Sequence, residues 1–118
     1  MTKEVLDFVA KKTHELMNAH SCSREAKEAA QNWLDSIGTE KEAAETKSYI
    51  EELEADIMPI DGLIVFAESE TGAKVFGADK AEAVAAHAKE IKAAGALYCD
   101  CPACASAESI LKRKAEML

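Results

Sequence analysis

Apolar residues recur three or four positions apart along most of this chain of 118 residues, and this spacing constrains the fold more than any other feature. It places the apolar side chains on one face of a helix, and that face must pack against another helix. The first such stripe consists of Val5, Val9, Thr13 and Leu16. The pattern predicts an all-α fold, a compact bundle of about five long helices that forms a single helical domain over residues 1–118.

The five long helices are expected over about residues 3–18, 23–38, 39–58, 79–94 and 102–118. Two of their boundaries carry specific signals. Thr39 and Glu42 have the spacing of a capping box, which would open the third helix. Pro102 suits the first position of the fifth helix, because the N–H that proline lacks is not needed there. Cys101 would then be the N-cap residue of that helix.

The segment 59–77 fits two structures. Its apolar run 63–67 and the segment Lys74, Val75 and Phe76 flank a turn-like stretch, which is typical of a β-hairpin. Its apolar residues also have helical spacing, and Asp61 and Ser69 are suitable N-cap residues. Because helices surround this segment, it is predicted to form two short helices, with a β-hairpin as the alternative.

The charge of the chain argues against two classes of partner. Its 22 acidic residues outnumber 14 basic ones, which gives a formal net charge of −8. Nucleic acids and anionic membranes both select basic surfaces, so neither is an expected partner. The chain starts in a helical pattern rather than in a signal peptide, and it has no apolar run near 18 residues. A cytoplasmic protein is therefore expected.

Three of the four cysteines fall within six residues, as Cys99, Cys101 and Cys104. The fourth, Cys22, lies in a short break between the first two expected helices. Cysteines of cytoplasmic proteins are normally reduced, so close spacing indicates metal binding or catalysis before disulfides. Cys101 and Cys104 would project from the same side of a first helical turn, and Cys99 would precede them in an extended segment.

A closed tetrahedral site needs four ligands, and Cys22 is the expected fourth, with His20 as a substitute. Four thiolates suit a zinc ion held structurally, and they also suit an iron–sulfur cluster. The predicted site is therefore a metal centre of Cys22, Cys99, Cys101 and Cys104, with zinc as the expected ion and an iron–sulfur cluster as the alternative.

Two other functions remain open from the sequence. Cys101 and Cys104 have the spacing of a redox dithiol at a helix start, with Cys99 as a resolving partner. The chain could also be a protein-interaction module in which the cysteines are small buried residues. No nucleophile–base pairing and no glycine-rich phosphate loop is visible, so nothing in the sequence supports an enzyme.

Three segments of the chain resemble a small uncharacterised family of proteins from anaerobic bacteria. These segments are Met58–Gly62, Phe66–Glu70 and Tyr98–Cys104. Members of that family sometimes carry a molecular-chaperone label. The resemblance implies a cytoplasmic bacterial protein, and it implies no defined activity.

Overall fold

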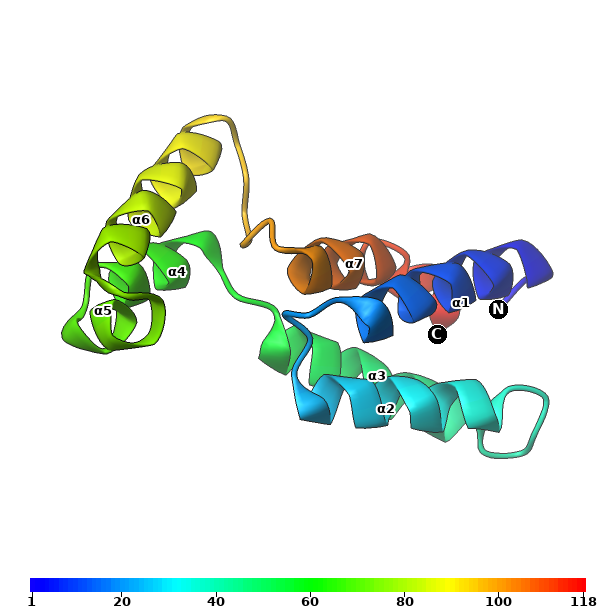
Figure 1. The fold of residues 1–118 in the computed structure, drawn as a ribbon. Coiled ribbons are helices and arrows are strands. Elements are labelled where there is room, and N and C mark those ends of the chain that lie inside the picture. The colour runs from blue at the N-terminus through cyan, green and yellow to red at the C-terminus, as the bar shows by residue number, and fades with distance from the viewer. The chain divides into compact units, whose positions relative to one another are not determined.

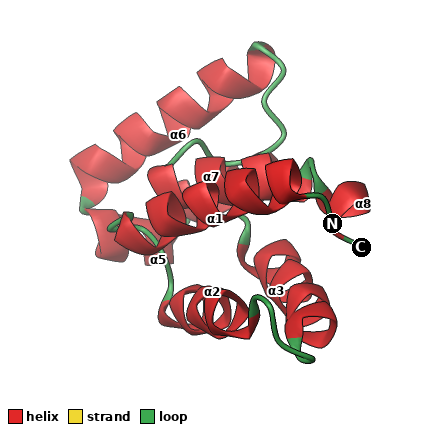
Figure 2. Ribbon diagram, turned by 90° about the vertical axis from the view of Figure 1, so that its right-hand side faces the viewer, coloured by secondary structure: helices red, strands yellow, loops and turns green.

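The computed structural model describes all residues 1–118 and contains eight helices and no strands. Figure 2 shows helices joined only by loops and turns. The helices are α1 (Lys3–Asn18), α2 (Arg24–Ser36), α3 (Glu42–Asp56), α4 (Ile60–Ala67), α5 (Glu70–Phe76), α6 (Ala78–Ala93), α7 (Pro102–Leu111) and α8 (Lys114–Met117). The all-α prediction is confirmed.

The number of helices differs from the expected five long ones. Residues 59–77 form the two short helices α4 and α5, so the β-hairpin alternative is wrong. The last expected helix also ends early, at Leu111, and the four-residue α8 follows it. Periodicity did not reveal this break, because apolar residues continue at helical spacing across it.

The capping box predicted at Thr39 does not form. The Thr39 hydroxyl donates a hydrogen bond to the carbonyl of Ser36 at 2.6 Å, which turns it back toward α2. Helix α3 instead begins after Lys41, whose side chain makes no capping bond. Threonine side chains often bond to a backbone carbonyl three residues earlier, and here that local bond replaces the cap.

The helices group into two packing units, which differ in how they are built. The larger unit consists of Met1–Ile57 and Asp100–Leu118, and it contains α1, α2, α3, α7 and α8. The smaller unit is Met58–Cys99, with α4, α5 and α6. This grouping does not test whether the two units form one domain, so the single domain stays a prediction. No helix is both long and apolar enough to cross a lipid bilayer.

In the larger unit, α2 pairs with α3 and α1 pairs with α7 (Figure 1). The rings of Trp33 and Tyr49 stack with their centroids 5.5 Å apart, and both residues are fully buried. Their polar atoms also find buried partners. The Trp33 indole N–H donates to Thr46 Oγ1 at 2.9 Å, and Tyr49 Oη lies 2.9 Å from Thr13 Oγ1. These bonds spare the core the cost of unsatisfied polar groups.

In the smaller unit, α4 and α5 pack on α6 (Figure 1). Its core centres on Ile60, Leu63 and Ala88, and Cys99 is among the half-buried residues that pack against it. Gly72 allows α5 to approach α4 closely, because a Cβ there would lie 2.0 Å from the carbonyl oxygen of Phe66.

A short antiparallel contact joins the two ends of the smaller unit. Pro59 and Tyr98 form an isolated bridge, in which the Ile60 N–H donates to the Leu97 carbonyl at 2.9 Å. The Cys99 N–H donates to the Met58 carbonyl at 2.8 Å. These bonds fix the backbone of Cys99 immediately before the chain continues into α7.

Candidate metal centre

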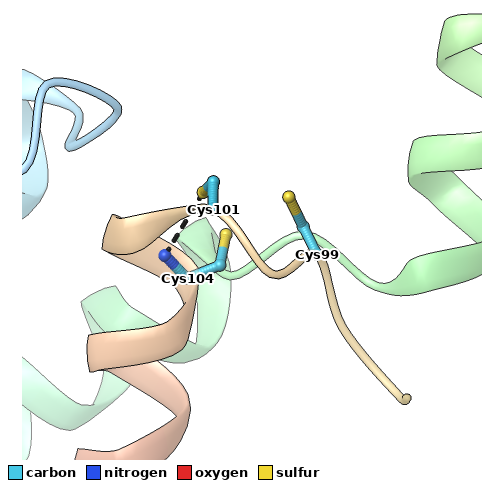
Figure 3. Close-up of side chains that lie close together, drawn as sticks. All are labelled: Cys99, Cys101 and Cys104. Atoms are coloured by element: carbon cyan, nitrogen blue, oxygen red, sulfur yellow. Dashed lines mark hydrogen bonds between the residues drawn. The ribbon is translucent and has the colours of Figure 1, made fainter. Parts of the chain in front are cut away.

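The sulfur atoms of Cys99, Cys101 and Cys104 all lie within 4.8 Å of one another. Figure 3 shows the three side chains gathered on one side of a single continuous segment. All four cysteines of the chain are present as thiols. The convergence expected from the C-x-C-x-x-C spacing is therefore found, and these three side chains could hold a thiophilic metal ion.

Helix α7 positions two of the three thiols. Cys101 is its N-cap residue, in extended backbone, and Pro102 occupies the first helical position as predicted. The Cys104 N–H donates a hydrogen bond to Cys101 Sγ at 3.4 Å (Figure 3). Sulfur at this position faces the unpaired N–H groups and the positive end of the helix dipole, so a thiolate is stabilised there.

The three thiols differ in their access to solvent. Cys104 is buried, with 8% of its surface exposed, whereas Cys99 and Cys101 are half-buried. Cys99 and Cys101 are therefore more accessible to solvent than Cys104 is.

Cys22 lies outside this group of three, and it shares a cavity with one member of it. A cavity of about 100 Å³ in the larger unit is lined by Cys22 and by Cys104. The Cys22 thiol donates to the carbonyl of Ser23 at 3.5 Å, and this bond is weak because a thiol is a weak donor. The α1–α2 junction thus brings Cys22 to the start of α7, although its sulfur is not clustered with the other three.

A second contact fastens the same junction to α7. The Ala103 N–H in the first turn of α7 donates to Ser21 Oγ at 3.2 Å, across 82 positions of sequence. Ser21 thereby satisfies one of the N–H groups that a helix start leaves unpaired. This bond holds the residue next to Cys22 against the residue next to Cys104.

The surroundings of Cys22 favour its protonated form. Burial raises the pKa of the Cys22 thiol above its ordinary value, the positive charge of Lys27 partly offsets this, and Asp56 and Cys101 add to the increase. A bound cation would reverse the balance, because it stabilises thiolates directly.

Three further residues lie near the cysteines in the sequence or in the structure: the predicted substitute ligand His20, and Ser21 and Asp56, which the sequence did not predict. His20 is exposed in the turn after α1 and is not in the group of close donors, so its role as a substitute ligand stays a prediction. Sequence reasoning missed Ser21 and also missed Asp56, whose side chain lines the cavity beside Cys22. No local signal marks either residue, because each acts through a partner distant in the sequence.

Comparisons with family models, with curated proteins and with solved structures gave no match to this chain. The resemblance to the family from anaerobic bacteria therefore stays a prediction. The geometry of the cysteines is the feature of this chain that points to a function.

Proposed function

We propose that this protein binds one zinc ion through the thiolates of Cys22, Cys99, Cys101 and Cys104, and that the ion stabilises the fold. The observation that carries the proposal is the convergence of three sulfur atoms within 4.8 Å at the start of α7. The zinc would hold the α1–α2 junction to α7. The proposal assumes a reducing compartment such as the bacterial cytoplasm, where neighbouring cysteines stay reduced.

The spacing of the three sulfurs is close to what zinc needs. Zinc–sulfur bonds of about 2.3 Å in a tetrahedron place the sulfurs about 3.8 Å apart. Each pair in the protein lies within 4.8 Å, so side-chain movements of about an ångström would complete the geometry. Rotations about the Cα–Cβ bonds supply such movements without any change in the backbone.

Cys22 is the proposed fourth ligand because it already lies on the cavity that Cys104 lines. Its weak bond to the Ser23 carbonyl costs little to break, so the side chain can turn toward the other thiols. The Ser21–Ala103 hydrogen bond keeps the junction next to α7 while it does so. Four thiolates would fill all positions of the ion and leave none for a substrate, which suits a structural role.

An iron–sulfur cluster is the alternative that the same thiolates would accept. The two metals are separated by elemental analysis and an absorption spectrum of protein purified without oxygen. About one zinc per chain and no visible absorption is the expected result. Iron with sulfide and a broad visible band would replace zinc by a cluster in the proposal.

Protein without any bound metal, even after incubation with zinc under reducing conditions, would contradict the proposal. It would favour an interaction module with incidental cysteines. A matched control is Ser109→Ala, which removes only a hydrogen bond to the Ala105 carbonyl within α7 and leaves all four thiols in place. This variant should still bind one zinc per chain, whereas Cys101→Ser should bind far less.

A further inference from the structure

We infer that Cys101 and Cys104 also form a dithiol that reduces small disulfides, and that disulfide reduction and metal binding are alternative states of the same thiols. The part of this inference that concerns inhibition by metal rests on the proposed zinc site. The exchange itself depends only on the geometry of the α7 start.

The geometry suits an intramolecular disulfide between these two residues. Helix geometry places the Cα atoms of residues three apart about 5 Å from each other, and a disulfide joins Cα atoms about 4.4–6.8 Å apart. Cys101 is the N-cap and Cys104 the third helical residue, so the bond would form within one turn. It would close no contact between distant segments, and the helices would keep their packing.

The difference in exposure assigns the two roles. Cys101 is half-buried and its sulfur lies at the end of the helix, where it can meet a second molecule. Cys104 is less exposed, at 8% of its surface, so Cys101 is the thiol that meets an external disulfide and Cys104 attacks the neighbouring sulfur. Cys99 is held through its N–H by the Met58 carbonyl and packs against the core of the smaller unit. Cys104 shares the first turn of α7 with Cys101, so it is the proposed resolving thiol.

The exchange balances with a small disulfide such as oxidised glutathione as the co-reactant. The Cys101 thiolate attacks one sulfur of the disulfide, which breaks the S–S bond and releases one glutathione thiolate. The Cys104 thiolate then attacks Cys101 Sγ in the mixed disulfide and releases the second. Both protein thiols lose a proton, the protein gives up two electrons, and two glutathione thiols are formed.

Zinc would suppress this reaction because it occupies both thiolates. A Cys101–Cys104 disulfide would in turn leave only Cys22 and Cys99 for the metal, which is too few for a closed site. Oxidation of zinc-loaded protein should therefore release the ion, and reduction should allow it to bind again. The two states would exchange without unfolding.

The test treats metal-free, reduced full-length protein with oxidised glutathione and maps the disulfides by mass spectrometry of peptides. The expected product is a Cys101–Cys104 disulfide with two glutathione molecules formed per chain. Cys104→Ser should stop at a mixed disulfide on Cys101. Ser109→Ala is the matched control, because its hydroxyl only bonds within α7 to the Ala105 carbonyl, and it should react as the unaltered protein does.

Zinc-loaded protein should react at least about tenfold more slowly, because a thiolate bound to metal is no longer the attacking nucleophile. A disulfide that involves Cys22 or Cys99, or no disulfide at all, would overturn the inference. So would equal rates in zinc-loaded and metal-free protein. A chain that takes up no zinc but completes the exchange would contradict the proposed zinc site and support the dithiol.

Discussion

Two helices of the larger unit begin in the same way but present different atoms. At α2 the N-cap residue is Ser23, whose hydroxyl oxygen accepts from the Ala26 N–H at 3.1 Å. At α7 the N-cap residue is Cys101, whose sulfur accepts from the Cys104 N–H at 3.4 Å. Both residues have extended backbone, and both bonds reach three residues along the chain.

The α2 cap suits helix stability, whereas the α7 cap presents a reactive sulfur atom. Serine is among the best N-cap residues, and cysteine is not. At α2 a thiol is present, but as Cys22 it lies one residue before the cap. At α7 the thiol itself caps the helix, and its capping bond is weaker than the bond that a serine hydroxyl would make. The α7 cap therefore indicates a role for Cys101 beyond starting a helix.

The largest expected effect comes from Cys101→Ser. Serine can cap α7 as it caps α2, so the stability of the metal-free protein should stay the same or rise slightly. Zinc affinity should fall by at least about 100-fold, which in excess zinc removes about 2.7 kcal/mol of zinc-dependent stability. Competition with a chromophoric chelator measures the zinc affinity, and thermal unfolding with and without zinc measures the zinc-dependent stability. A large loss of stability in the metal-free variant would break the comparison between the caps.

Cys22→Ser should weaken zinc binding less, by about 10- to 100-fold. The three thiols of the C-x-C-x-x-C segment remain on one continuous stretch, and water can take the fourth position. The same competition assay measures the loss. An affinity equal to that of the unaltered protein would exclude Cys22 as a ligand.

The pH dependence of unfolding tests the buried Tyr49 in the core of the larger unit. Burial raises the pKa of Tyr49 well above its ordinary value, and the hydrogen bond with Thr13 partly opposes this. The neutral phenol is thus favoured in the folded protein. Stability should be fully present below about pH 10 and should fall by about 1.4 kcal/mol per pH unit above it.

Tyr49→Phe is the control for that prediction. It removes the titrating group, so the decrease above pH 10 should become shallower in urea unfolding curves recorded at several pH values. It also removes the bond between Tyr49 Oη and Thr13 Oγ1, so stability at neutral pH should fall by about 1 kcal/mol. An unchanged slope would show that Tyr49 does not cause it.

The smallest expected effect comes from Ser23→Ala. Loss of the α2 cap should cost about 1 kcal/mol, within the usual range for such caps. The variant should still bind one zinc per chain, because the hydroxyl is no ligand and Cys22 is retained. Chemical unfolding and zinc titration check the two statements. Loss of the metal would show that the α2 cap is needed to position Cys22.

The sequence predicted the local parts of this structure and not the distant ones. The Cys101 cap, the Pro102 position and the convergence of three thiols follow from spacing over six residues, and the structure contains all three. The Thr39 capping box failed because the same side chain had a second local partner in the Ser36 carbonyl.

Residue spacing did not predict the contacts that join segments far apart in the sequence. The bond between Ser21 and Ala103 spans 82 positions, and nothing in either neighbourhood indicates it. The approach of Cys22 to the cavity beside Cys104 was inferred only from the need for a fourth ligand. Tertiary packing determines such contacts, and the spacing of residues within one segment carries no information about them.

The most direct test of the four-thiolate site is X-ray absorption at the zinc edge of zinc-loaded, reduced protein. The proposed site predicts a first shell of four sulfur atoms at about 2.3 Å and no lighter ligand. Three sulfurs with one nitrogen or oxygen atom at about 2.0–2.1 Å would contradict the role of Cys22. A shell without sulfur would contradict the metal centre altogether.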